Sequence, residues 1–525
     1  MSVKSERTEQ PEQHVPVSKK LVIINSTSSI AAHLLNMGVL IWLQPFLLSR
    51  VSIDEYTLYP VVMAPLVFIP LISTILTGGL GRFGVEAYAR GDSARVTEIA
   101  STILPLLAGA GAAIMAGGGL FAWKVDRILD IAPGLVSDAR WMFLLLVSAA
   151  SLRVLLAPME IGLFIRQKFV LQNVINLSMQ FFRLSLLMAL LFGVSPRVLW
   201  LVVASVITES LGLIITVALS RHYVPALRFR IRAIRWGCAP ELVSFGGWTF
   251  VMQAAGSLRK GVIPIVLNKL STSLQVSCYY LGTLALEQVQ FMTFLATQAL
   301  LPAMVAMHAR GDRHGLADVY LRGGRIGLWF STSISVPLVI FSRELFSIYV
   351  GPGYLSAALV TALLMAVLPL QFANVMLTRL AMATGEMKRY SLQMLINHGL
   401  GLIISIALIW RFDMGAVGGA IGSCFAIGLM QPAVMWRMGR RLAGVTFGQW
   451  VRTTVVPGVI PALAGLPGWL AVWLLFPQRT WSELILGAVP GGLLFFAGLF
   501  LFGLTPQDRG DLRNVLSRVG LVARA

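Results

Sequence analysis

Residues 141–163 read WMFLLLVSAASLRVLLAPMEIGL, an apolar run with Arg153 near its centre. A bilayer core is about 30 Å thick, and about 20 residues of helix cross it. Similar runs recur from Leu21 to Leu504 in a chain of 525 residues that is 57% hydrophobic and only 12% charged. The sequence therefore predicts an all-α polytopic membrane protein.

Fourteen spans are predicted, and they fall near residues 21–47, 57–80, 98–122, 141–163, 171–194, 197–219, 244–267, 276–305, 323–341, 356–382, 391–410, 415–436, 453–476 and 482–504. Lys and Arg concentrate in the loops on one side of this arrangement, which marks that side as cytoplasmic. With an even number of spans, both termini are expected in the cytoplasm. We expect the protein in the inner membrane of a bacterium.

A formal charge of +19 is typical of proteins that bind nucleic acid. Basic loops set the orientation of membrane proteins, so topology accounts for most of this charge and no nucleic-acid partner is predicted. The densest segment, residues 221–240, carries Arg221, Arg228, Arg230, Arg232 and Arg235. It is interpreted as a cytoplasmic linker between two halves. Contact with anionic lipid headgroups is the alternative, and a topology signal is preferred.

A short repeat supports the division into halves. Tyr88-Ala89-Arg90-Gly91-Asp92 follows the second span, and His308-Ala309-Arg310-Gly311-Asp312 follows the eighth. Both copies occupy the same place in a six-span unit, so the two units would be parallel repeats around a midplane cavity. The predicted domains are a tail (1–20), a first six-helix lobe (21–220), the linker (221–240), a second lobe (241–437), helices 13 and 14 (438–504) and a C-terminal tail (505–525).

Basic side chains lie inside several spans, with few acids beside them: Arg153, Arg183, Arg259 and Lys260. A charge at the centre of a membrane helix costs about 2.5 to 3.5 kcal/mol on insertion scales, so these residues are functional candidates. Guanidinium groups match phosphate oxygens, which predicts a cavity for an anion. Pairing with buried acids such as Glu209 or Glu287 is the structural alternative. Arg379, near the end of its span, is expected to snorkel to the interface.

Several motifs resemble those of polysaccharide and O-antigen flippases, a branch of the multidrug/oligosaccharidyl-lipid/polysaccharide exporter superfamily. The resemblance covers about residues 20–445. Its landmarks are Asn25 through Leu48, Gly79-Leu80-Gly81-Arg82, Phe245-Gly246-Gly247-Trp248, Tyr279-Tyr280, Pro302, Val350-Gly351-Pro352-Gly353-Tyr354, Thr384-Gly385-Glu386-Met387-Lys388, and Gly415 with Gly418, Gly419 and Gly422. It implies two six-helix lobes, with two extra C-terminal helices that could shape a groove for a lipid tail.

The resemblance implies a flippase that moves a polyprenyl-diphosphate-linked oligosaccharide outward by alternating access, for surface polysaccharide synthesis. Its partners would be this lipid-linked substrate, membrane lipids, and a polysaccharide polymerase or glycosyltransferases. Asn25, His33 and Asn36 in the first span are candidate polar residues of the cavity. The loop charges Arg90, Asp92, Arg310 and Asp312 are candidates for closing the cytoplasmic gate by charge pairing, with solvated loop charges as the more common case.

Two other functions are alternatives. An ion-coupled exporter of small molecules belongs to the same superfamily, but a cation exporter would need an acidic cavity. A membrane glycosyltransferase or polysaccharide polymerase would need larger exterior loops, since the longest, about residues 123–140, is short. The sequence also has no phosphate-binding loop for ATP and no cysteine spacing for a metal. A transporter without cofactor, rather than an enzyme, is therefore predicted.

Overall fold

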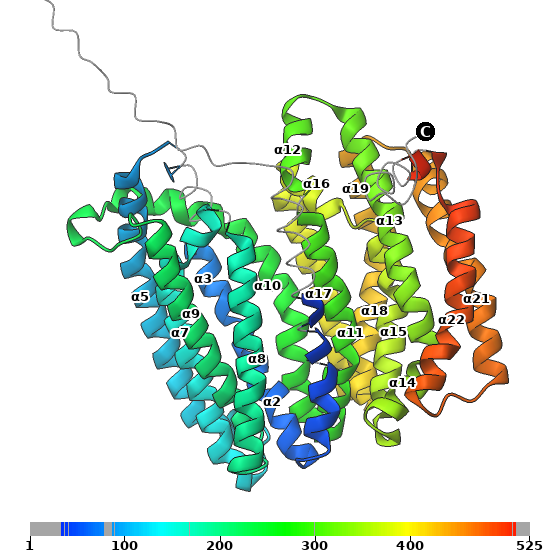
Figure 1. Ribbon diagram of the computed structural model, residues 1–525, viewed down its shortest axis with the longest axis horizontal. Helices are drawn as coiled ribbons and strands as arrows, with labels where there is room; N and C mark the ends of the chain where they lie inside the picture. Colours follow the sequence, from blue (N-terminus) through cyan, green and yellow to red (C-terminus); the bar gives the residue numbers. More distant parts are fainter. Residues whose placement is uncertain are drawn as a thin grey trace, which may run out of the picture. The chain divides into compact units, whose positions relative to one another are not determined.

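The computed structural model describes residues 33–35, 37–39, 41–77, 87–88, 90–166, 168–298, 300–506 and 508–510. Every regular element within these residues is a helix (Figure 1). Eleven of the described helices are long and apolar enough to cross a membrane, and two bent helix pairs raise that number to 13. These 13 correspond to the second through fourteenth predicted spans. The prediction of an all-α polytopic fold is confirmed.

The first predicted span is described only in part, as an apolar helix over His33–Leu48. The ninth differs from a simple span because it bends by 73° between Ile340 and Ser342. Pro337 lies just before this bend, and a proline removes one helix hydrogen bond and clashes with the preceding turn.

The chain folds into two compact units, residues 1–265 and 266–525. In the first unit α7 packs against α5 and α9, and α8 packs against α9. These helices run side by side in Figure 1. The helices of this unit are α2 (Ile53–Leu66), α3 (Ile69–Thr77), α5 (Ser93–Trp123), α6 (Val125–Ile128), α7 (Val136–Ile165), α8 (Phe169–Gly193), α9 (Leu199–Tyr223) and most of α10 (Ala239–Leu270).

In the second unit α15 packs against α11, α13 and α18, and α17 packs against α18. The helices of this unit are α11 (Ser273–Gln298), α12 (Leu301–Ala309), α13 (Arg313–Ile340), α14 (Ser342–Tyr349), α15 (Leu355–Phe372), α16 (Leu377–Ala383), α17 (Met387–Phe412), α18 (Gly415–Met430), α19 (Trp436–Ala443), α20 (Phe447–Trp450), α21 (Val456–Leu475) and α22 (Trp481–Gly498). Single π-turns, Gln431–Met435, Val451–Val455 and Leu499–Gly503, continue α18, α20 and α22.

The boundary between the two units falls inside α10, whereas the sequence places a linker at residues 221–240. Backbone groups of that linker are hydrogen-bonded to α5, so it belongs to the first unit. The predicted lobe boundaries stay a prediction.

Helix ends show the internal repeat more clearly than the sequence does. Ser52 caps α2 by accepting from the Glu55 N–H at 3.3 Å, and Thr272 accepts from the Gln275 N–H at 3.4 Å at the start of α11. Glu55 Oε1 then accepts from the Val198 N–H at the start of α9, and Gln275 Oε1 accepts from the Ala416 N–H in α18. Both of these distances are 2.9 Å.

The Arg-Gly-Asp part of the shared sequence has the same structure in both units. Gly91 and Gly311 have φ values of 73° and 70°, a conformation that favours glycine. Asp92 and Asp312 follow them and cap α5 and α13, each accepting from the backbone N–H three residues on at 2.8 Å. Corresponding helices of the two units start about 220 positions apart, as expected for parallel repeats.

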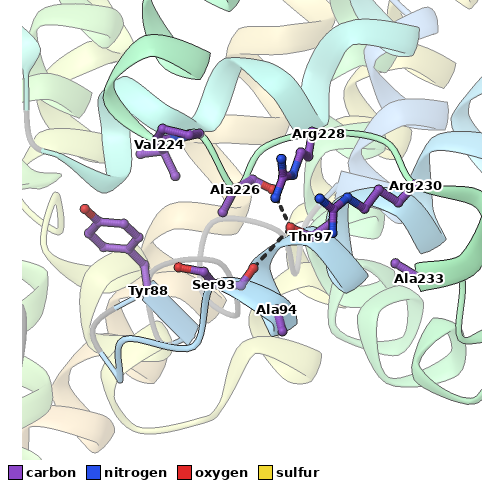
Figure 2. Close-up of a pocket in the computed structure, with 10 residues that line it drawn as sticks. Tyr88, Ser93, Ala94, Thr97, Val224, Ala226, Arg228, Arg230 and Ala233 are labelled. Carbon is purple, nitrogen blue, oxygen red and sulfur yellow. Dashed lines mark hydrogen bonds between the residues drawn. The ribbon is translucent and has the colours of Figure 1, made fainter. Parts of the chain in front are cut away.

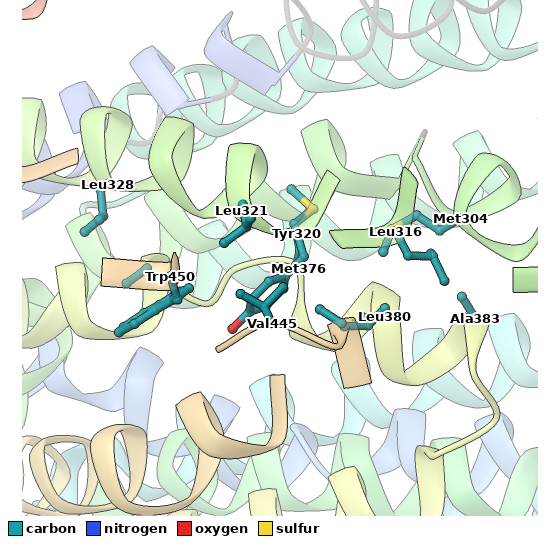
Figure 3. Close-up of a cluster of buried hydrophobic side chains, with 12 residues drawn as sticks. Met304, Leu316, Tyr320, Leu321, Leu328, Met376, Leu380, Ala383, Val445 and Trp450 are labelled. Carbon is teal, nitrogen blue, oxygen red and sulfur yellow. The ribbon is translucent and has the colours of Figure 1, made fainter. Parts of the chain in front are cut away.

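The last two helices are attached to the second unit through α13. Trp329 Nε1 donates to the Pro457 carbonyl at 2.8 Å, and Thr454 Oγ1 donates to the Leu321 carbonyl at 2.8 Å. Beside these bonds lies a buried apolar cluster, drawn in Figure 3. It joins α12, α13 and α16 to the segment before α21, and its labelled members are Met304, Leu316, Tyr320, Leu321, Leu328, Met376, Leu380, Ala383, Val445 and Trp450.

Candidate functional site

A cavity of about 660 Å³ lies within the first unit, between the end of α2, the start of α3, and α7, α8 and α9. Its lining alternates apolar patches with polar and charged groups. The charged and polar side chains that line it are Arg153, Glu160, Gln172, Asn176, Gln180, Arg183, Thr208, Glu209, Ser210 and Thr216. A cavity of this size accommodates a headgroup rather than a single ion.

Arg153 and Arg183, singled out from the sequence, both line this cavity. Arg153 lies on α7 and is exposed to the cavity, while Arg183 lies on α8 and is half-buried. The two helices are consecutive in the chain, which is why the sequence could place these residues near each other.

Two carboxylates share the same cavity, and the sequence did not reveal how they balance the arginines. Glu160 is electrostatically coupled to Arg153. Glu209 and Arg183 both interact electrostatically with the hydroxyl of Tyr59. The expectation that few acids accompany the basic residues is therefore wrong for this cavity, whose lining carries two arginines and two glutamates. Such a site can hold an anion at the guanidinium groups.

Amide side chains on α8 form a polar stripe along the cavity. Gln172, Asn176 and Gln180 recur every four residues, so they lie on one face of the helix together with Arg183. Gln172 Nε2 donates to Asn176 Oδ1 at 3.2 Å and to Thr216 Oγ1 of α9 at 3.4 Å. These positions were not singled out from the sequence, and their four-residue spacing is the signal that could have found them.

Close helix packing fixes the wall that carries Glu160. A side chain at Gly162 would collide with Ser220 of α9, so α7 and α9 can approach only because this residue is glycine. Ser220 Oγ donates to the Glu160 carbonyl at 2.9 Å and accepts from the Leu163 N–H at 3.3 Å. These bonds hold the turn of α7 that presents Glu160 to the cavity.

The corresponding helices of the second unit carry no charge at the matching positions. When positions are counted from the helix starts, Phe372, Gly401 and Phe425 stand where Arg153, Arg183 and Glu209 stand in the first unit. Neither α15 nor α18 contains a charged residue. The charged cavity is thus specific to one of the two repeats within the described part of the chain.

Arg379 does not snorkel, which corrects the sequence interpretation. It is only 5% exposed, and its guanidinium donates to Thr297 Oγ1 at 3.3 Å and to the Phe294 carbonyl at 3.1 Å. It also lies 4.8 Å from the centroid of the Phe294 ring. Arg325, which the sequence places at the edge of a span, is likewise buried, at 5% exposure.

The other predicted site residues that the structure describes do not line the cavity. Arg259 is half-buried and Lys260 is exposed on α10, beside Gly261, where α10 approaches Phe68 and the Ala64 carbonyl. His33 is half-buried and does not line the cavity, while Asn25 and Asn36 lie outside the described residues. Asp92 and Asp312 cap helices, and their predicted pairing with Arg90 and Arg310 stays a prediction.

No protein-family model matches the chain. Its curated relative "Uncharacterized membrane protein EpsK" of Bacillus subtilis (strain 168) is 18% identical over 503 residues, which cover 93% of this chain and 96% of the relative. Among solved structures, an inward-facing multidrug resistance MATE family transporter of the MOP superfamily has a TM-score of 0.63 at 12% identity, over 79% of this chain and 95% of that one. The lipid II flippase MurJ in an inward closed conformation has a TM-score of 0.65 at 12% identity, over 91% and 98%.

The fold of this chain is therefore similar to that of these two MOP superfamily structures. A further MOP superfamily transporter, from Pyrococcus furiosus and described as having a binding pocket of reverse polarity, has a TM-score of 0.63 at 11% identity, over 81% of this chain and 96% of that one. Because the proteins with this fold are described with different substrates, the fold by itself does not identify what this chain binds.

Proposed function

We propose that this protein is a transporter that moves a polyprenyl-diphosphate-linked oligosaccharide from the cytoplasmic to the outer leaflet by alternating access. The observation that carries the proposal is that Arg153 and Arg183 line one cavity together with a stripe of amide side chains. Guanidinium groups bind phosphate oxygens through paired donors. Amides suit sugar hydroxyls, because they both donate and accept hydrogen bonds.

The length of the match also supports a flippase. MurJ aligns with 91% of this chain, whereas the MATE structures align with 79% or 81%. The difference is comparable in length to the two terminal helices α21 and α22. As the sequence resemblance implies, these helices would shape a groove for a lipid tail that stays in the bilayer. We assign no cofactor and no catalytic step to the chain.

An ion-coupled exporter of small molecules is the second candidate, and Glu160 and Glu209 are the observation in its favour. The two functions require different residues of the cavity. Transport of a diphosphate depends on Arg153 and Arg183, while export of a cation depends on the two carboxylates.

The test measures whether lipid-linked oligosaccharide reaches the outer leaflet of spheroplasts, using an impermeant lectin or glycosidase. We expect R153Q and R183Q to leave the lipid accumulated but inaccessible, and E160Q with E209Q to retain at least part of the labelling. The exposed Arg411 at the end of α17 provides a matched control, R411Q. Unchanged labelling in R153Q/R183Q would contradict the role of the two arginines in binding a diphosphate. Labelling that does not depend on the protein would reject the flippase.

A further inference from the structure

The segment after α9 alternates basic and apolar side chains: Arg228, Phe229, Arg230, Ile231, Arg232, Ala233, Ile234, Arg235 and Trp236. Its larger apolar side chains face outward. Phe229 is 40% exposed, Ile231 is 74% exposed and Trp236 is 56% exposed. A topology signal requires basic residues but gives no reason for exposed aromatic and aliphatic groups between them. This pattern is typical of segments that lie in a membrane interface.

Hydroxyl groups of α5 hold the backbone of this segment. Thr97 Oγ1 donates to the Ala226 carbonyl at 2.7 Å, and Ser101 Oγ accepts from the Arg230 N–H at 3.0 Å. Next along α5, Thr102 Oγ1 accepts from the Arg235 N–H at 3.0 Å. Because these bonds use the backbone, the side chains of Arg228 and Arg230 and the exposed apolar side chains remain available to an external partner.

A pocket of about 520 Å³ lies between this segment and the start of α5. Figure 2 shows Arg228 and Arg230 reaching over α5 beside Thr97, with Tyr88 and Ser93 also on the pocket wall. No acidic residue is among its lining side chains. Within the described residues neither of these two guanidinium groups has a hydrogen bond or an ion pair. The nearby acid Glu98 pairs with Arg95 and, at 3.8 Å, with Arg235.

The length of α5 indicates where the pocket lies relative to the membrane. A helix of 31 residues is about 46 Å long at about 1.5 Å per residue, which exceeds a hydrocarbon core of about 30 Å. The surplus lies at its first turns, because Arg95 and Glu98 are there while the far end reaches Trp123. The hydroxyls that hold the segment therefore lie in the headgroup layer, where a phosphate group and acyl chains are both within reach.

We propose that this pocket binds the phosphate of an anionic phospholipid in the leaflet beside it, through Arg228 and Arg230. Ser93 and Tyr88 add hydroxyl donors, and Phe229, Ile231 and Trp236 contact the acyl region. Guanidinium groups suit this role because they bind phosphate oxygens with paired donors. The site is separate from the cavity between α7, α8 and α9, and it does not depend on what the protein transports.

The test uses the full-length protein in detergent and counts retained lipids by native mass spectrometry during titration with phosphatidylglycerol or phosphatidylcholine. We expect one tightly held phosphatidylglycerol per chain and no equivalent phosphatidylcholine. R228Q/R230Q should weaken this binding about 30-fold, since each basic residue near a membrane surface contributes about 1 kcal/mol. R313Q/R389Q removes two exposed arginines elsewhere in the chain and serves as the charge-matched control, with binding unchanged.

Equal weakening in both double variants would overturn the proposal, because binding would then follow net charge rather than this pocket. Equal retention in both would overturn it as well. If inorganic phosphate at millimolar concentration displaced the lipid completely, the pocket would be a site for soluble anions instead. Size-exclusion profiles and lipid-free melting temperatures check folding, and the single variants R228Q and R230Q replace the double variant if it unfolds.

Discussion

Arg325 of α13 and Asp508 beyond α22 form a buried ion pair, with Nη2 2.6 Å from Oδ2 and both side chains about 5% exposed. Arg325 Nη1 also donates to the Thr453 carbonyl at 2.8 Å, and Arg322 lies 3.3 Å from the same carboxylate. One aspartate thus connects the end of the last helix to α13, the helix on which α21 packs.

Removal of this carboxylate should strongly destabilise the second unit. D508N leaves the Arg325 guanidinium buried without its counter-charge, and breaking a buried pair in this way costs about 3 to 5 kcal/mol. We expect a clear fall in the apparent melting temperature of the purified protein. The double variant R325M/D508L replaces both charges by apolar groups and should recover most of the loss. A D508N protein that melts like the wild type would show that the pair does not stabilise the fold.

The same ion pair predicts a dependence on pH. Burial raises the pKa of Asp508, but hydrogen bonds from Thr505 and Arg325 outweigh it, so the net pKa lies below its usual value. A lowered pKa in the folded state contributes stability that is complete above the unfolded value of about 3.9 and is lost as the pH falls through the folded value. The stability difference between wild type and D508N should be constant from about pH 8 to 5 and shrink below about pH 4. A difference that grew on acidification would contradict this assignment.

Glu55 and Gln275 should each contribute to stability by accepting a hydrogen bond through a side-chain oxygen, so the charge of Glu55 should not matter. E55A removes the acceptor for the Val198 N–H, and Q275A removes that for Ala416. Loss of a helix cap costs about 0.5 to 2 kcal/mol. E55Q keeps the acceptor and should resemble the wild type. Hydrogen exchange of peptides covering the starts of α9 and α18 measures the effect locally. Equal exchange in E55A and E55Q would argue against the cap.

Packing of α11 against α15 depends on the absence of a side chain at Gly282. A Cβ there would lie 2.6 Å from Val360 Cγ1 and 2.8 Å from the Ala357 carbonyl oxygen. G282A should therefore destabilise the protein by about 1 to 3 kcal/mol through overpacking. At Gly399, inside α17, a Cβ would meet no other atom within 4 Å, so G399A should be neutral or stabilising by up to about 1 kcal/mol. Thermal unfolding of the two variants compares them directly.

The sequence was sufficient for the membrane fold because apolar length is a local property. Runs such as residues 141–163 predicted spans that the structure confirms, and the placement of Arg153 beside Arg183 followed from consecutive helices. It was insufficient where contacts cross many residues. Glu160 and Glu209 come to the same cavity only through packing of α7 on α9, and the burial of Arg379 depends on another helix, α11.

The capping residues are more alike between the two repeats than the residues at the cavity positions are. Ser52 and Glu55 have counterparts in Thr272 and Gln275 that make the same bonds, whereas Arg153 and Glu209 correspond to phenylalanines. This contrast fits a duplicated half-chain in which the residues at the helix ends stayed alike and the residues at the cavity positions changed. One repeat then carries the charged cavity, while the other repeat has no charge at the matching positions.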